Sequence, residues 1–276
     1  MINYLKRGVR YILKGEPVAR PIIRAQIVYS SPSGKLNGKK IIVTGGGRGL
    51  GFAMAQKFKA EGAEVLIAGR NEDTLHKSAN EINCKYLPLD VTNVSSFDGF
   101  INEADHLLGG VNCLVNNAGI SLHESSFKDV TVETFDKQIN TNLRGGFFLT
   151  QHFVQLLESK HREGNIIFVS SETGETVDTR PYGWTKAAVN SMMKGLAYQL
   201  AKENIRVNAI APGVTTSDMT GFKEDGNIYY AEGATKRVYL PGEVAEAATF
   251  LLSDFARCIS GQVIVLNNGK TINFRK

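Results

Sequence analysis

The chain is poor in cysteine and has no long apolar run. Its three cysteines, Cys84, Cys113 and Cys258, lie far apart and form no Cys-x-x-Cys pair. This spacing argues against a disulfide framework and against a cysteine zinc site, and it indicates a reducing compartment. No stretch of about 18 consecutive apolar residues occurs, so we expect no transmembrane helix. We therefore expect a protein of the cytoplasm with no bound metal.

Proline is scarce as well, with 7 residues against 28 glycines. Together with 42% hydrophobic and 21% charged residues, this composition excludes collagen-like and wholly disordered chains. A length of 276 residues suits one well-buried core. We expect one domain of catalytic size.

Positive charge is distributed unevenly along the chain. The net charge is +5, yet the first forty residues hold nine of the 32 Lys and Arg and only one acid, Glu16. The rest of the chain is therefore mildly acidic. This distribution argues against a nucleic-acid partner for the body of the protein.

Residues 1–35 are interpreted as a basic N-terminal arm and linker. Apolar side chains at positions 2–13 recur on one face of a short amphipathic helix, and glycines and prolines interrupt the pattern over residues 15–38. Three alternatives stay open for the arm. It docks on the protein through the apolar stretch at residues 22–28, makes peripheral contact with an anionic membrane, or is disordered.

Short apolar runs alternate with longer helical patterns over residues 36–276. This is the order of repeated βαβ units. Most of the predicted strands are too apolar to face water, so helices are expected on both faces of the sheet. The sequence predicts the α/β class, as a single-domain, Rossmann-type, doubly wound parallel sheet. Strands are predicted at residues 40–44, 64–68, 111–115, 165–169, 206–210 and 262–266.

A glycine-rich turn follows the first predicted strand and opens onto a helical pattern. The sequence reads Thr44-Gly45-Gly46-Gly47-Arg48-Gly49-Leu50-Gly51. Gly45 permits a tight turn, Gly49 allows the backbone to approach a pyrophosphate, and Gly51 allows close packing of helix on strand. The turn predicts a dinucleotide site.

An arginine follows the second predicted strand. NAD-binding folds carry an acidic residue at this position, which hydrogen-bonds the 2′-hydroxyl of the adenosine ribose. Arg70 follows Gly69 at this point, and Arg48 lies in the glycine-rich turn. Two guanidinium groups suit the 2′-phosphate of NADP. The predicted cofactor is therefore NADP, with NAD as the alternative.

These motifs and others in the same order resemble the short-chain dehydrogenase/reductase family, from about residue 36 to the C-terminus. The further matches are Leu89-Asp90-Val91, Asn116-Asn117-Ala118-Gly119, the Tyr-x-x-x-Lys pair Tyr182 and Lys186, and the turn Pro212-Gly213. The cofactor contacts that the motifs and the resemblance imply are Thr44, Gly45, Gly47, Arg48, Gly49, Leu50, Gly51, Arg70, Asp90, Val91, Asn117, Ala118, Gly119, Tyr182, Lys186, Pro212 and Gly213.

Lys186 lies four positions after Tyr182, which places both on one face of a helix. A neighbouring ammonium lowers the pKa of a tyrosine, so Lys186 is expected to favour the phenolate of Tyr182, the predicted general acid and base. Ser171 is predicted to donate to the developing alkoxide, with Ser170 as the alternative. Asn142 resembles the family asparagine that holds a water between the lysine and solvent.

Together these residues predict an NADP-dependent oxidoreductase that interconverts a ketone or aldehyde and an alcohol by hydride transfer, that is, a carbonyl reductase acting on a small molecule. A 3-oxoacyl thioester reductase, a sugar or polyol dehydrogenase and a non-catalytic dinucleotide-sensing scaffold are the alternatives. The loop at residues 214–238, the substrate loop, is expected to select the substrate as a mobile lid. Long helical patterns at residues 131–157 and 181–201 resemble interface helices, so we expect a homodimer or homotetramer.

Overall fold

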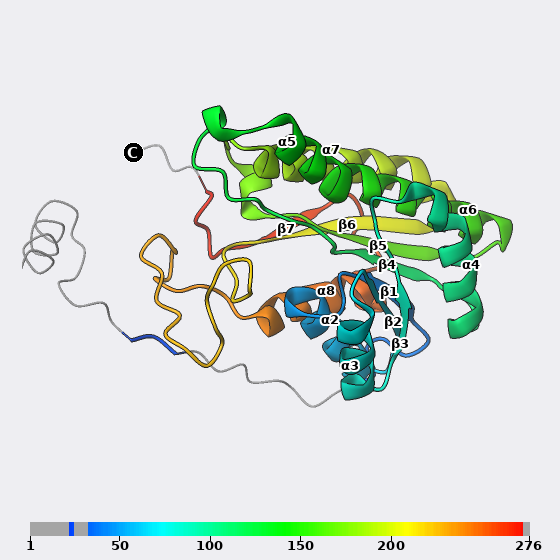
Figure 1. Cartoon of the computed structure of the whole chain (residues 1–276). Coiled ribbons are helices and arrows are strands. Elements are labelled where there is room, and N and C mark those ends of the chain that lie inside the picture. The colour runs from blue at the N-terminus through cyan, green and yellow to red at the C-terminus, as the bar shows by residue number, and fades with distance from the viewer. Residues whose placement is uncertain (1–21, 25–32, 273–276) are drawn as a thin grey trace, which may run out of the picture.

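Seven parallel strands form one sheet between two layers of helices (Figure 1). The computed structural model describes residues 22–24 and 33–272. The strand order is β3-β2-β1-β4-β5-β6-β7, so the chain reverses direction across the sheet between β1 and β4. This topology confirms the predicted doubly wound α/β fold. The strands are β1 (Lys40–Thr44), β2 (Glu64–Gly69), β3 (Lys85–Pro88), β4 (Cys113–Asn116), β5 (Gly164–Val169), β6 (Ile205–Pro212) and β7 (Val263–Leu266).

All six predicted strands are present, and their ends differ from the prediction by at most two residues. Strand β3 is not among the predicted strands. Its sequence, Lys-Tyr-Leu-Pro, lies at the edge of the sheet and has no fully buried residue. An edge strand of this kind lacks the apolar run that identifies the central strands.

Helices cover both faces of the sheet, as predicted. Figure 1 shows α4, α5, α6 and α7 on one side and α2, α3 and α8 on the other. Phe97, Phe153 and Met193 pack in the core of the first side, and Met54 and Phe58 pack in the core of the second. In the described part of the chain, no helix has the length and apolarity to cross a membrane. The helices are α2 (Gly49–Ala60), α3 (Glu72–Ile82), α4 (Phe97–Leu108), α5 (Val132–Ile139), α6 (Gly146–Ser159), α7 (Pro181–Gln199) and α8 (Pro241–Leu252).

A buried carboxylate holds the residues that precede β1. The backbone N–H groups of Ser33 and Lys35 donate to Glu61 Oε2 at 3.1 and 3.3 Å. Burial alone would raise the pKa of Glu61, but hydrogen bonds from Lys57, Ser33 and Lys35 and the charge of Lys57 outweigh it and lower the pKa to about 2. The amphipathic helix predicted at residues 2–13 lies outside the described residues.

Candidate active site

A cleft of about 940 Å³ opens at the carboxyl ends of the strands, where the strand order reverses. Ligands of doubly wound sheets bind at this switch point. The glycine-rich turn, the end of β2 and the loops after β4, β5 and β6 line the cleft. Every residue predicted to contact the cofactor lines it, with the exception of Thr44.

The glycine-rich turn brings bare backbone to the cleft. Gly45 and Gly49 have φ angles of +64° and +53°, which lie in the left-handed region that favours glycine. A Cβ atom on Gly51 would lie 2.2 Å from the carbonyl oxygen of Gly45, so this close approach requires glycine. Arg48 gives α2 no side-chain cap. The N–H groups of the first helical turn therefore face the cleft as donors for an anion.

Thr44 ties the turn to the neighbouring strand rather than lining the cleft. Its hydroxyl accepts hydrogen bonds from the N–H groups of Asn117 and Ala118, both at 3.0 Å. The Asn117 amide in turn donates to the carbonyl oxygens of Thr44 and Gly45 at 2.8 and 3.2 Å. The structure thus shows Thr44 holding the turn against the chain after β4, and its contact with the cofactor stays a prediction.

Two arginines and two aspartates mark one end of the cleft. Arg70 is exposed at the end of β2, and within residues 22–24 and 33–272 it has no hydrogen bond or ion pair. Arg48 Nη1 lies 3.1 Å from Asp218 Oδ2 in an exposed ion pair that spans the glycine-rich turn and the substrate loop. The pKa of Asp90 is lowered by hydrogen bonds from the Thr92 backbone and side chain and by the charge of Arg70.

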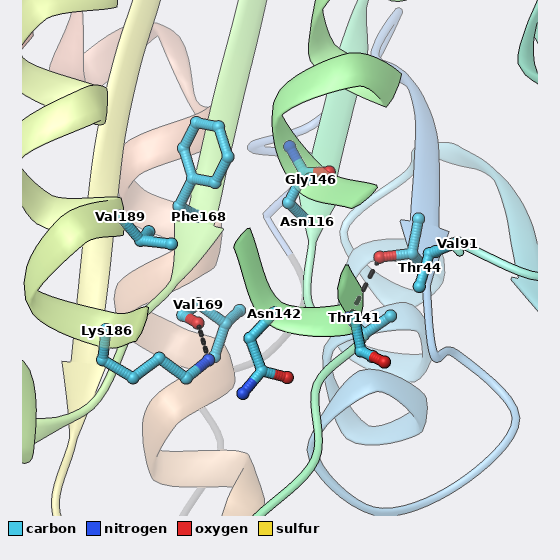
Figure 2. A pocket seen from close by; sticks show the side chains of 11 residues that line it. Thr44, Val91, Asn116, Thr141, Asn142, Gly146, Phe168, Val169, Lys186 and Val189 are labelled. Carbon is cyan, nitrogen blue, oxygen red and sulfur yellow. Dashed lines mark hydrogen bonds between the residues drawn. The ribbon is translucent and has the colours of Figure 1, made fainter. Parts of the chain in front are cut away.

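At the other end of the cleft, helix α7 presents Tyr182 and Lys186. Lys186 is buried, and its ammonium donates to the carbonyl oxygen of Val169 at 2.8 Å (Figure 2). The same nitrogen lies 5.6 Å from the centroid of the Tyr182 ring. Burial lowers the pKa of Lys186 to about 8. The four-residue spacing therefore brings the two side chains together, as expected.

The pKa of Tyr182 differs from the prediction in direction. Burial raises it, the hydrogen bond with Ser171 lowers it, and the charges of Asp178 and Arg180 raise and lower it respectively. Lys186 is not among these influences. Its ammonium lies over the ring of Tyr182 and donates to the carbonyl oxygen of Val169. Burial is therefore the largest influence on the pKa of Tyr182, and the pKa is raised where the sequence spacing suggested that it would be lowered.

The two adjacent serines have different partners. Ser170 donates its hydroxyl to the carbonyl oxygen of Lys186 at 3.3 Å. Ser171 hydrogen-bonds Tyr182 and accepts from the N–H and hydroxyl groups of Thr173 at 3.3 and 3.0 Å. Only Ser171 of the two is therefore joined to the tyrosine.

Asn142 lies behind the cleft on a π-helical turn, Asn140–Gly145, between α5 and α6. Its side chain accepts from the N–H of Ile120 and donates to the carbonyl of Ile120, both at 2.8 Å. Figure 2 shows Asn142 and Lys186 pointing toward the same space. A cavity of about 10 Å³ lies there, close to the volume that one water molecule needs. Asn142 and Lys186 thus line the same small cavity, at a distortion that is frequent at functional sites, and the water expected to link the lysine to solvent stays a prediction.

Two ion pairs beside the predicted catalytic residues were not expected from the sequence. Glu172 follows Ser171, lines the cleft and pairs with Lys270 at 2.6 Å. Arg180, two residues before Tyr182, also lines the cleft and makes a two-point contact with Asp178 at 3.0 and 3.2 Å. Their position next to the predicted serine and tyrosine is the signal in the sequence that points to them.

Known proteins of similar sequence and structure are oxidoreductases. Residues 45–271 match the family model described as enoyl-(acyl carrier protein) reductase. The chain is 35% identical over 245 residues to 3-oxoacyl-[acyl-carrier-protein] reductase FabG of Aquifex aeolicus, covering 85% of this chain and 98% of the relative. It is 31% identical over 242 residues to 3alpha-hydroxysteroid dehydrogenase of Mediterraneibacter gnavus, covering 83% and 95%.

Two solved structures are similar to this chain in fold as well as in sequence. The structure of gox2181 matches with a TM-score of 0.80 at 29% identity, covering 87% of this chain and 99% of that one. A short-chain type dehydrogenase/reductase from Mycobacterium ulcerans matches with a TM-score of 0.79 at 28% identity, covering 86% and 91%. In both cases the similarity extends over almost the whole of the known chain.

Proposed function

The chain belongs to the short-chain dehydrogenase/reductase family of oxidoreductases, and from this membership we propose that it interconverts a ketone or aldehyde and an alcohol with NADP as the cofactor. The observation that carries the proposal is the meeting of Ser171, Tyr182 and Lys186 at one end of the dinucleotide-sized cleft. Acid-base chemistry on a carbonyl oxygen needs a proton donor, a second hydrogen-bond donor and a nearby positive charge, and these three residues supply them.

The residues of the cleft fit a nicotinamide dinucleotide. The uncapped first turn of α2 offers N–H donors for the pyrophosphate, and the bare backbone at Gly45 and Gly49 leaves room for it. At the far end, Gly119 and the Pro212-Gly213 turn line the space beside Tyr182 and Lys186. The dinucleotide, when bound, supplies the hydride.

The chain's own residues handle the proton. The Tyr182 hydroxyl donates its proton to the carbonyl oxygen, and the Ser171 hydroxyl holds the same oxygen by a hydrogen bond. Because burial raises the pKa of Tyr182, the hydroxyl is protonated at neutral pH and ready to donate. Lys186 and Asn142, around the small cavity behind the cleft, return a proton from solvent to the tyrosine. In alcohol oxidation each transfer runs in reverse.

A 3-oxoacyl thioester is the second candidate substrate. It is favoured by the relatives of that name, among them FabG of Aquifex aeolicus. The test is consumption of NADPH by the purified protein with a panel of simple ketones, steroid ketones, sugar ketones and 3-oxoacyl thioesters. We expect turnover with at least one class. Tight NADPH binding with no turnover on any of them would instead support a dinucleotide-sensing scaffold.

The preference for NADP rests on Arg70 and Arg48. We expect Arg70→Ala to raise the Kd for NADPH by about ten- to a hundredfold, because the variant loses charge-assisted hydrogen bonds to the 2′-phosphate. NADH lacks that phosphate, so its Kd should change by less than about twofold. Calorimetric titration with both cofactors makes NADH the internal control. Equal weakening of both would show that Arg70 does not read the phosphate.

Assembly as a homodimer or homotetramer is also part of the proposal. The helices that resemble interface elements carry exposed apolar side chains, among them Val132 on α5, Phe147 on α6, and Trp184 and Tyr198 on α7. Figure 1 shows these helices on the same side of the sheet. Burial of such side chains between subunits removes apolar surface from water.

A further inference from the structure

Part of the N-terminal arm contacts the substrate loop. The arm lies outside the region that matches the family model, whereas the loop lies within it. That match begins at residue 45, whereas the described residues 22–24 belong to the arm. Figure 1 shows this short segment beside the loop that precedes α8. The contact therefore joins a segment outside the family match to the loop expected to select the substrate.

Two hydrogen bonds from the Ile23 backbone hold the segment to the loop. The N–H of Ile23 donates to Asn227 Oδ1 at 3.1 Å, and the carbonyl oxygen of Ile23 accepts from the N–H of Ile228 at 3.2 Å. The carbonyl of Ile228 accepts from Val238 at 2.9 Å. Ile228 is thus bonded to Ile23 through its N–H and to Val238 through its carbonyl oxygen, so this one residue links the segment at residues 22–24 to the end of the substrate loop.

The side chain of Ile23 packs against a small apolar cluster that is separate from the two cores beside the sheet. Ile228, Val238 and Leu240 form the cluster with exposed fractions of 4% or less, and Ile23 packs against it. The neighbouring Ile22 is 74% exposed. The two adjacent isoleucines therefore differ, and of the two only Ile23 packs against the cluster.

The cluster connects directly to the wall of the cleft. Tyr239, next to Val238, donates its N–H to the carbonyl of Val214 at 2.8 Å and accepts from the N–H of Thr216 at 2.9 Å. Val214 and Thr216 line the cleft. A chain of backbone bonds therefore runs from Ile23 through Ile228 and Val238 to the cleft wall.

We propose that Ile23 is a positioning residue for the substrate loop, and that residues 22–24 hold this loop in the conformation in which Val214 and Thr216 line the cleft. Among the alternatives for the arm, this assigns residues 22–24 to docking on the protein's own body. The effect on catalysis rests on the proposed function, because it takes residues 214–238 to contact the carbonyl substrate.

The test compares three substitutions in the full-length chain. Ile23→Ser removes the apolar contact. Ile22→Ser is the matched control at the exposed neighbour. Ile23→Val keeps most of the apolar contact. Tryptic cleavage after Lys223 under native conditions reports the opening of the loop without need of turnover. Melting temperature, the Kd for NADPH, and KM and kcat with the carbonyl substrate complete the measurements.

We expect Ile23→Ser to speed cleavage after Lys223 by about tenfold, because cleavage follows the population of the open loop and the lost apolar contact favours opening. KM for the carbonyl substrate should rise several-fold, while the Kd for NADPH and the melting temperature stay near those of the wild type. Ile22→Ser and Ile23→Val should behave like the wild type in every measurement.

Equal cleavage rates for Ile23→Ser and Ile22→Ser would overturn the proposal. So would unchanged cleavage together with loss of binding to phosphatidylglycerol vesicles, which would assign the segment to a membrane surface. If no carbonyl is reduced by the wild type but Ile23→Ser still accelerates cleavage, the proposed function fails while the positioning role of Ile23 stands.

Discussion

Tyr182→Phe is expected to lower kcat for carbonyl reduction by about a hundred- to ten-thousandfold, the range that general acid catalysis contributes. Phenylalanine keeps the ring and removes only the hydroxyl that donates the proton, so the fold and the Kd for NADPH should change little. The measurement is steady-state kinetics together with cofactor titration. Tyr198→Phe is the matched control, because Tyr198 lies on the same helix and does not line the cleft.

A Tyr182→Phe enzyme with near-normal kcat would contradict the assignment of the proton donor. The same substitution would then point to Ser171, the hydroxyl that hydrogen-bonds Tyr182, as the source of the proton. Loss of NADPH binding in this variant would instead show a change in the structure of the cleft and not a chemical effect.

Lys186→Ala is expected to lower kcat by about a hundredfold or more and to raise the Kd for NADPH by about tenfold, because one ammonium serves both the proton relay and the cofactor. The ammonium also donates to Val169, so the melting temperature is measured in parallel. Lys194→Ala, at an exposed lysine of the same helix, is the control. A fall in kcat with unchanged cofactor affinity would contradict the dual role.

The pH profile gives the Lys186 prediction a second readout. Burial lowers the pKa of Lys186 to about 8, so the residue is charged below that pH and neutral above it. The wild-type rate of reduction should therefore fall as the pH rises through about 8. Lys186→Ala should lose this limb of the profile, whereas Lys194→Ala should keep it.

The sequence predicts the conformation of the glycine-rich turn almost completely, because its determinants are local. The turn between β1 and α2 is short, and its glycines are required by backbone conformation at Gly45 and Gly49 and by close approach at Gly51. The same holds for Tyr182 and Lys186, since helical spacing alone places them on one face. These features depend on neighbours in the chain.

The features that the sequence did not predict depend on contacts between distant residues. The bonds of the Thr44 hydroxyl to β4 and to the turn after it join residues more than seventy positions apart. The raised pKa of Tyr182 follows from burial in the folded protein, and spacing from Lys186 says nothing about burial. The pairing of Glu172 with Lys270 joins residues almost a hundred positions apart. Strand β3 likewise owes its place to pairing with β2.

Hydride transfer to a carbonyl in this cleft, with Tyr182 as the proton donor, is tested most directly with NADPH deuterated at C4 of the nicotinamide. The alcohol formed by the full-length wild-type enzyme from the active substrate is analysed by mass spectrometry. We expect one deuterium on the carbon that bears the new hydroxyl, and almost no product from Tyr182→Phe in the same time. Alcohol without deuterium, or equal product from the two enzymes, would contradict this mechanism.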